Sequence, residues 1–292
     1  DPLHEANMVT DVIIIGAGAA GLMCAATAGA RGRRVVVIDH HRSPGRKILV
    51  AGGGRCNFTN REVAASHYVS QNPPFPISAL KRYGPEDFLD MVERHGIAID
   101  ERALGRLFCA GTSQEILDML LAECEGAGVT LTLGARIREV RRHPRGGFTI
   151  DIGDRRLDAT SLVIATGGLS LPTSGATPFG LELARQLGLG VVAPRPGLVP
   201  LTLQPQELRI VEGFSGIARD AAVTAGGQTF RENLLFTHRG LSGPVILQAS
   251  NHWIPGQPIT IDLFPGGDLP ALLRDGRARR PKAGLAAILA PA

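Results

Sequence analysis

A short apolar run that passes directly into a glycine-rich turn most constrains what this chain can fold into. Val12–Ile15 is β-branched throughout and is followed by Gly16-Ala17-Gly18-Ala19-Ala20-Gly21. The uncharged segment that comes next, up to Ala30, has the length of a helix, and a second β-branched run ends at Asp39. Strand, turn, helix and strand in this order predict two parallel strands joined by a right-handed crossover. We therefore expect an α/β fold that opens a Rossmann-like, doubly wound sheet.

The glycine turn matches the G-x-G-x-x-G pattern of dinucleotide-binding folds, and its place between a strand and a helix strengthens the match. Gly16 permits a tight turn, Gly18 lets the backbone approach a pyrophosphate, and Gly21 lets the helix pack on the strand. The N–H groups and dipole at the helix N-terminus favour phosphate. Asp39 is expected to accept hydrogen bonds from ribose hydroxyls and to disfavour a 2′-phosphate. The pattern alone does not distinguish FAD from NAD.

The uncharged stretch from Val12 to Ala30 is close in length to a membrane span, but its β-branched start and its glycines favour strand, turn and helix. The acids Asp1, Glu5 and Asp11 before it do not fit a signal peptide. Four scattered cysteines without C-x-x-C spacing, and histidines without H-x-x-x-H spacing, indicate neither a disulfide framework nor a metal site. We expect a cytoplasmic protein without a metal or a membrane partner.

Basic residues gather in one part of the chain. The net charge is +4, and Asp39 is the only acid between Arg31 and Arg61. Such a mild, local excess suits a phosphate-bearing ligand better than a nucleic-acid backbone. A second basic run, Arg274–Lys282, has no interleaved aromatic residue, so we interpret it as a solvated helix end or linker. The expected partner is a small-molecule substrate rather than a nucleic acid, and the sequence indicates no oligomeric state.

Four parts are predicted along the chain: a tail over 1–10, a Rossmann-like domain over 11–193, a β-rich domain over 194–265 and the start of a helical subdomain over 266–292. The boundary after 193 is marked by Pro194-Arg195-Pro196-Gly197. Hydrophobic periodicity within the second part predicts further helices over 78–95, 113–126 and 179–187, and further strands over 129–133, 136–142, 148–152 and 162–166.

A second glycine-rich segment follows the second strand. It reads Gly45-Arg46-Lys47-Ile48-Leu49-Val50-Ala51-Gly52-Gly53-Gly54-Arg55-Cys56-Asn57-Phe58-Thr59-Asn60. We expect a loop at the carboxyl edge of the sheet, where ligands of α/β folds bind, with its cations offsetting phosphate charge. Together with the first glycine turn, this segment resembles the bacterial flavoprotein family that includes aminoacetone oxidase and a bile-acid reductase, a group of NAD(P)/FAD-dependent oxidoreductases.

The resemblance extends through Gly105-Arg106 with Phe108, Ala165–Gly168, Pro196–Leu201 and Phe236–Pro244. It implies an FAD domain interrupted by a β-rich insert and a helical piece, and a C-terminal truncation, because similar flavoproteins close with a glycine-rich strand that this chain lacks. Matching positions imply that Ile137, in the strand 136–142, faces the adenine. The full set of implied cofactor-binding residues is Gly16, Gly18, Ala19, Ala20, Gly21, Asp39, Arg46, Lys47, Gly53, Gly54, Arg55, Asn57, Ile137, Thr166 and Gly167.

The resemblance implies an FAD-dependent oxidoreductase that passes hydride between the flavin and a small organic substrate or NAD(P)H. A cation of the second glycine segment would stabilise negative charge on the reduced ring. Two alternatives stay open, an NAD-only dehydrogenase and a non-catalytic nucleotide-binding or tRNA-associated flavoprotein fragment. No residue stands out as a general base. An inert, packed Cys56 is preferred over a reactive thiol, and His40 and His41 are interpreted as solvated loop residues.

Overall fold

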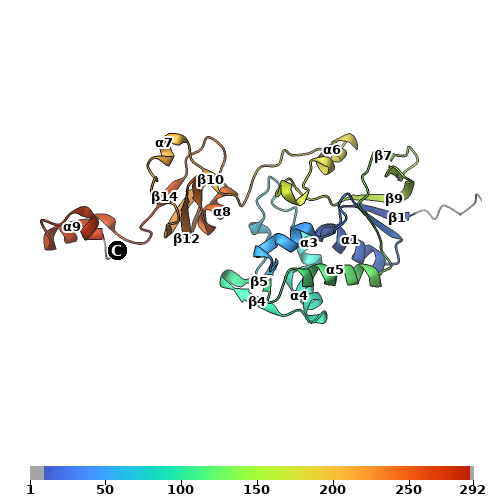
Figure 1. Cartoon of the computed structure of the whole chain (residues 1–292), viewed down its shortest axis with the longest axis horizontal. Helices are drawn as coiled ribbons and strands as arrows, with labels where there is room; N and C mark the ends of the chain where they lie inside the picture. Colours follow the sequence, from blue (N-terminus) through green and yellow to red (C-terminus); the bar gives the residue numbers. More distant parts are fainter. Residues whose placement is uncertain (1–9, 290–292) are drawn as a thin grey trace, which may run out of the picture. The chain divides into compact units, whose positions relative to one another are not determined.

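A computed structural model describes residues 10–289 of the chain, which form two compact units divided between Pro194 and Arg195, and we treat these separately (Figure 1). The expected tail over 1–10 lies outside the described residues except for Thr10, which is the first residue of strand β1 (Thr10–Ile15) and not part of a tail. Among the described residues, no helix combines the length and apolar character needed to span a bilayer.

The first unit is built on a six-stranded sheet in the order β6-β2-β1-β9-β8-β7. Its parallel part consists of β1, β2 (Val35–Asp39), β6 (Thr130–Leu133) and β9 (Arg156–Ile164). An antiparallel extension adds β8 (Phe148–Asp151) and β7 (Glu139–Arg142). Because β1 has a strand on either side and is covered on both faces, every position of its apolar run is β-branched.

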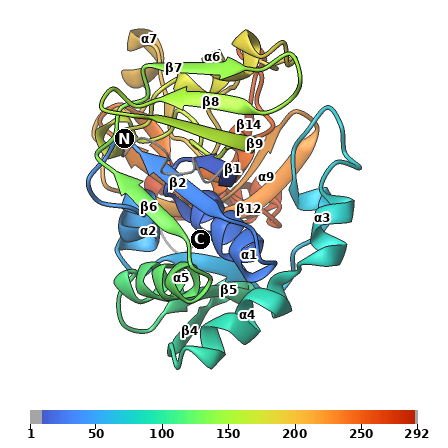
Figure 2. The same ribbon diagram turned by 90° about the vertical axis from the view of Figure 1, so that its right-hand side faces the viewer.

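The two faces of this sheet carry separate cores. Ile14 packs into one core together with α1 (Ala19–Ala30) and α5 (Gln114–Gly126), which lie side by side on that face (Figure 2). The isoleucines on either side of it in β1 point the other way, into a core that includes Leu183 of α6 (Phe179–Gln186). Helices on both faces of a mainly parallel sheet make a Rossmann-like, doubly wound α/β fold, which confirms the predicted fold class.

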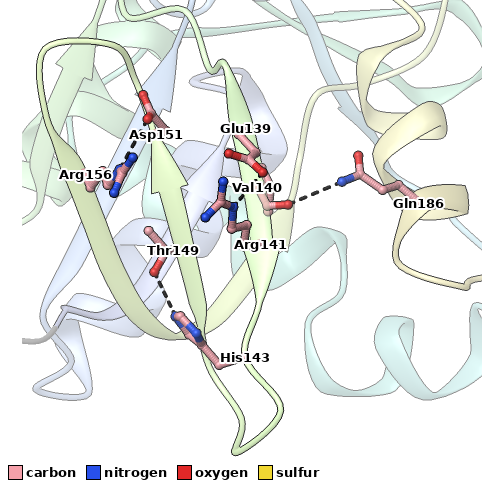
Figure 3. Close-up of polar contacts among 8 residues, drawn as sticks. All are labelled: Glu139, Val140, Arg141, His143, Thr149, Asp151, Arg156 and Gln186. Carbon is pink, nitrogen blue, oxygen red and sulfur yellow. Dashed lines mark hydrogen bonds and ion pairs between the residues drawn. The ribbon is translucent and has the colours of Figure 1, made fainter.

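Polar contacts on the antiparallel extension show how its hairpin is held (Figure 3). Gln186 of α6 donates a hydrogen bond to the carbonyl of Val140 at 3.3 Å, so the helix is tied to the edge strand. The other contacts in this view lie on the exposed side and join Glu139 to Arg141, Asp151 to Arg156 and His143 to Thr149. Exposed ion pairs contribute only about 0–1 kcal/mol each, so the buried side chains of this hairpin dominate its stability.

Two predicted elements differ from those observed because of local backbone chemistry. The helix expected over 78–95 is two helices, α3 (Ile77–Arg82) and α4 (Pro85–Arg94). Pro85 has no N–H to continue the first helix and instead starts the second one, with Gly84 as its N-cap. The loop expected over 45–60 contains a short helix, α2 (Arg46–Val50), a 3₁₀ turn and a strand, β3 (Asn57–Asn60).

Two predicted strands have different limits. The strand expected over 136–142 begins only at Glu139, whose partner Asp151 is the last residue of β8, so Ile137 lies ahead of the strand. The strand expected over 162–166 is the end of β9, which is longer because its first half pairs with β8 and its second half with β1. β9 ends at Ile164, so Thr166 belongs to the loop that follows.

A small three-stranded sheet in the order β3-β5-β4 completes the first unit. β4 (Ile99–Arg102) and β5 (Arg106–Cys109) form an antiparallel hairpin, and β3 pairs with β5. Because β3 begins at Asn57, this sheet is joined to the glycine-rich segment that follows β2.

The second unit is β-rich. A five-stranded antiparallel sheet in the order β10-β13-β12-β11-β14 carries a third core. Its strands are β10 (Leu201–Thr202), β11 (Ala218–Ala225), β12 (Gln228–Thr237), β13 (Gly240–Ser242) and β14 (Thr260–Asp262). The unit's helices are α7 (Pro205–Leu208), α8 (Pro244–Ser250), α9 (Leu269–Arg279) and α10 (Leu285–Leu289). The predicted basic run starts in α9, and its arginines are exposed.

Candidate nucleotide-binding site

A cavity of about 670 Å³ lies at the carboxyl ends of β1, β2 and β9. Its walls come from the glycine turn 16–20, the end of β2 at 39–41, the start of α2 at 45–48 and two stretches of the loop after β9, 165–168 and 174–176. Ligands of doubly wound sheets bind outside the carboxyl ends of the strands. The cavity is therefore in the position at which this fold class holds a ligand.

The three glycines of the turn differ in what a side chain would meet. A Cβ on Gly21 would overlap the carbonyl oxygen of Gly16, and a Cβ on Gly16, at φ +111°, would overlap the carbonyl oxygen of Ala165. A Cβ on Gly18 would have no heavy atom within 4 Å, and Gly18 lines the cavity. Gly16 and Gly21 are thus required by the packing of the turn itself. Gly18 instead leaves open space against the backbone, as expected where a pyrophosphate approaches.

The N-terminus of α1 faces the same space. Gly18 is its N-cap and offers no side-chain hydrogen bond, and the first turn contains no acidic residue. Ala19 and Ala20 of that turn line the cavity. The first N–H groups of a helix lack intrahelical acceptors, and the dipole places partial positive charge at this end. This end of the cavity is suited to bind an anion.

Asp39 joins the glycine turn to the end of β2. Its Oδ2 accepts a hydrogen bond from the Ala17 N–H and its Oδ1 accepts one from the His41 N–H, both at 2.8 Å. Each carboxylate oxygen can accept a further hydrogen bond, and Asp39 lines the cavity, so the predicted ribose contact is compatible with this arrangement. The G-x-G-x-x-G pattern did not predict the role of Asp39 in holding the turn.

The two cations of α2 hold the loop after β9. Lys47 Nζ donates hydrogen bonds to the Gly168 carbonyl at 3.0 Å and to Ser170 Oγ at 3.3 Å. Arg46 Nη2 donates a hydrogen bond to the Thr173 carbonyl at 3.2 Å. Both side chains also line the cavity. Positive charge therefore lines the same cavity as the N-terminus of α1, and the same two side chains hold the loop after β9.

His41 lies against Arg46, although the sequence was interpreted as placing it in a solvated loop. Arg46 Nη1 lies 3.0 Å from Nδ1 and 2.9 Å from Nε2 of its ring. Burial, together with the charges of His40 and Arg46, lowers the pKa of His41. A Cβ on Gly175, at φ +84°, would overlap the ring. No spacing pattern in the sequence signals this residue, because Gly175, which packs against its ring, belongs to a loop far along the chain.

A second cavity of about 380 Å³ adjoins the first. The two share lining residues Gly16, Asp39, His40, Thr166 and Gly175. Ile137 lines the second cavity even though it precedes strand β7, and Phe179 of α6 provides another apolar wall. The two cavities therefore meet at the glycine turn and the end of β2.

The predicted cofactor contacts are only partly brought together. The first cavity is lined by Gly16, Gly18, Ala19, Ala20, Asp39, Arg46, Lys47, Asn57, Thr166 and Gly167. Gly21 lies behind the turn, and neither cavity includes Gly53, Gly54 or Arg55 among the described residues that line it. Left-handed backbone at three successive glycines turns the chain there, and Arg55 lies 3.7 Å from Asp100 instead.

Apolar residues form the end of the first cavity and carry no motif that would have identified them. They are Met23, Ile48, Phe58, Phe88, Ile116 and Leu120. They come from α1, α2, β3, α4 and α5, so only the folded chain assembles them. This end of the cavity is suited to a flat, apolar ring system rather than to phosphate.

Cys56 also lines the first cavity, and it is buried with φ +48°. Burial raises the pKa of the Cys56 thiol. Burial, together with the proximity of Cys56, raises the pKa of Cys109 to about 11. A protonated, packed thiol agrees with the inert interpretation of Cys56. No cluster of three or more metal-ligating side chains is found among the described residues.

Comparison with known proteins gives two family matches. Residues 10–235 match the model described as HI0933-like protein Rossmann domain, and residues 195–291 match the one described as HI0933-like protein barrel and H2TH domain.

Three curated relatives align with most of the chain. The ribosomal RNA dihydrouridine synthase of Escherichia coli is 50% identical over 281 residues, which are 96% of this chain and 70% of that protein. The protein of the same name from Haemophilus influenzae is 43% identical over 97% of this chain and 71% of its own length. The 3-dehydro-bile acid delta(4,6)-reductase of Clostridium scindens is 30% identical over 86% of this chain and 64% of its own length.

Proposed function

The chain belongs to the HI0933-like family, and on that premise we propose that it is an FAD-dependent reductase that adds two hydrogens across a carbon–carbon double bond of uracil in ribosomal RNA. The observation that carries the proposal is the cavity at the N-terminus of α1, with open space at Gly18 and cations on α2. The names of the relatives from Escherichia coli and Haemophilus influenzae, which align over 96% and 97% of this chain, indicate the base and the RNA. Such an enzyme would act in the cytoplasm.

The described residues fit FAD. The N–H groups of Ala19 and Ala20, at the dipole of α1, would hold the diphosphate against the open face of Gly18. Asp39 would accept hydrogen bonds from the ribose, and the second cavity at Ile137 would take the adenine. When bound, FAD supplies a ring that accepts a hydride from a donor such as NAD(P)H and gives it to the substrate.

The apolar end of the first cavity has a separate task. Met23, Phe58 and Leu120 would exclude water from the space beside the ring, which protects a transferred hydride from solvent. Arg46 and Lys47 would balance the negative charge of the diphosphate. The Cys56 thiol, whose pKa is raised by burial, would stay protonated at neutral pH.

RNA as the substrate differs from the small molecule that the composition favoured. The exposed arginines of α9 support the change, since Arg274, Arg277 and Arg279 lie on one short helix with a single acid, Asp275, among them. Such a local excess of positive charge attracts a polyanion more than it attracts a neutral metabolite.

The test uses ribosomal RNA from cells in which the gene is deleted. Purified protein with FAD and NADPH or NADH should convert one or more uridines to dihydrouridine, detected as a gain of two hydrogens by nucleoside mass spectrometry. Ribosomal RNA from cells that retain the gene and a steroid with conjugated double bonds serve as comparison substrates. If the flavin is bound and reduced but only the steroid is consumed, the RNA part of the proposal is wrong.

A further inference from the structure

The hairpin of β4 and β5 has at its tip a leucine in an unfavourable conformation. Leu104 has φ +64°, the left-handed region that side chains with a Cβ rarely adopt. Its side chain is 75% exposed, so no core packing offsets the strain. Leu171 and Leu198 share this combination of positive φ and exposure, so what distinguishes Leu104 is the arginines that flank it in the chain.

A second unfavourable feature occupies the same tip. Arg102 and Arg106 are directly opposite each other in the register of the hairpin, and like charges in such positions repel. Arg102 is balanced by Asp100 at 2.9 Å and its guanidinium lies 4.0 Å from the centre of the Phe108 ring. Arg106 donates from Nε to the Ala103 carbonyl at 3.0 Å and has no carboxylate partner among the described residues.

A third arginine completes this tip. The Arg61 N–H donates to the Gly105 carbonyl at 2.8 Å, and its Cβ lies 3.1 Å from where a Cβ on Gly105 would stand. Glu101 pairs with its guanidinium at 3.0 Å. The tip therefore carries one exposed apolar side chain and three arginines, of which Arg106 is the least neutralised.

The tip is connected to the cavity described above through the pairing of two strands. β5 pairs with β3, whose first residue, Asn57, lines the first cavity. The Asn57 amide also donates to the Leu107 carbonyl at 2.9 Å and so links the two strands through its side chain. A ligand bound at the tip is thus held by the same small sheet that forms a wall of the cavity.

We propose that this tip, residues 102–106, is an RNA-binding element of the enzyme. Arg106 and Arg102 contact backbone phosphates, and Leu104 packs against the face of a base next to the uridine that enters the cavity, which helps to unstack it. Arginines that contact phosphates and an apolar wedge that separates bases are a recurring combination in nucleic-acid recognition. A single leucine is too small for the apolar centre of a stable protein interface. The inference rests on RNA being the substrate.

The decisive variant is Leu104→Gly in the complete protein. Glycine accepts the positive φ without strain, so the melting temperature should stay the same or rise, while the affinity for ribosomal RNA and kcat/KM for its reduction should fall by roughly tenfold. A matched control is Leu198→Gly, because Leu198 has φ +53° and is 63% exposed in the other unit. It should show the same thermal behaviour with unchanged RNA binding. Flavin content checks that the cavity is intact.

Arg106→Ala gives an independent readout. Loss of one phosphate contact should weaken binding to RNA of any sequence. It should also reduce the slope of log K against log salt concentration by about one. RNA affinity equal to that of the original protein in both Leu104→Gly and Arg106→Ala would overturn the inference, and so would a fall in melting temperature and flavin content with Leu104→Gly. If the protein binds RNA through this tip without reducing it, the proposed reaction fails and the binding element stands. If it binds no RNA, both fail.

Discussion

Replacing Gly18 with alanine separates the folding of the glycine turn from its binding of the cofactor. Gly18 has φ −88° and ψ −172°, which alanine adopts freely, and its Cβ would meet no heavy atom within 4 Å. The change should raise the free energy of unfolding by about 0.4–1 kcal/mol, because alanine reduces the conformational entropy of the unfolded chain. Alanine is a poorer N-cap than glycine, so at the start of α1 it should lower the free energy of unfolding by a similar amount, about 0.5–1 kcal/mol. The free energy of unfolding should therefore change by less than about 0.5 kcal/mol.

The effect on FAD should be much larger. The added methyl group occupies the space in which the diphosphate would approach the N–H groups at the start of α1. Losing one hydrogen bond to a charged group costs about 1.5–3 kcal/mol, which corresponds to roughly a 10- to 150-fold weaker Kd. Denaturant unfolding of the cofactor-free protein and a titration that follows quenching of flavin fluorescence measure the two quantities separately.

Gly126→Ala is the matched control. Gly126 also has open space at its Cβ position, but it ends α5 and does not line either cavity among the described residues. This variant should bind FAD as the original protein does. If Gly18→Ala also keeps the original Kd, the diphosphate does not lie against Gly18 and the assignment of this end of the cavity is wrong.

Three further changes test other parts of the site. Gly21→Ala should destabilise the protein by about 1–3 kcal/mol or more, since the new methyl group overlaps the Gly16 carbonyl oxygen, and a lower midpoint of urea unfolding would show it. Lys47→Met should change stability by less than about 1 kcal/mol, because its contacts to Gly168 and Ser170 are exposed, yet it should raise the Kd for FAD and reduce its salt dependence, measured by titration at two salt concentrations. The lowered pKa of His41 means that the unfolded chain binds a proton more readily, so stability should be complete above its usual pKa and fall as the pH drops below it. His41→Asn should flatten that part of the pH profile, and an unchanged profile would contradict the assigned environment.

The part of the fold that depends on residues close together in the sequence was predictable. The strand, glycine turn and helix from Val12 to Ala30 follow from local patterns, and so does the place of a cavity at the end of β1. The strand ending at Asp39 was also predictable, because buried parallel strands form continuous β-branched runs.

The remainder depends on contacts between segments far apart in the sequence. Lys47 was expected to face a phosphate, and its hydrogen bond to Gly168 spans 121 positions, which no local pattern signals. Arg55 was expected at the cofactor, and its ion pair with Asp100, after three glycines with left-handed backbone, is another contact that no local pattern signals. The strand expected to contain Ile137 starts two residues later, because strand pairing, rather than the apolar pattern alone, determines its limits.

The flavin content of the purified protein tests the central proposal most directly. Denaturing the purified protein should release one FAD per chain. The released FAD is identified by chromatography and by its fluorescence before and after cleavage of the diphosphate. FAD, rather than FMN, is expected because the second cavity at Ile137 and Phe179 offers a place for the adenine. A colourless preparation that fails to bind added FAD, or one that holds FMN alone, would contradict the proposed cofactor site.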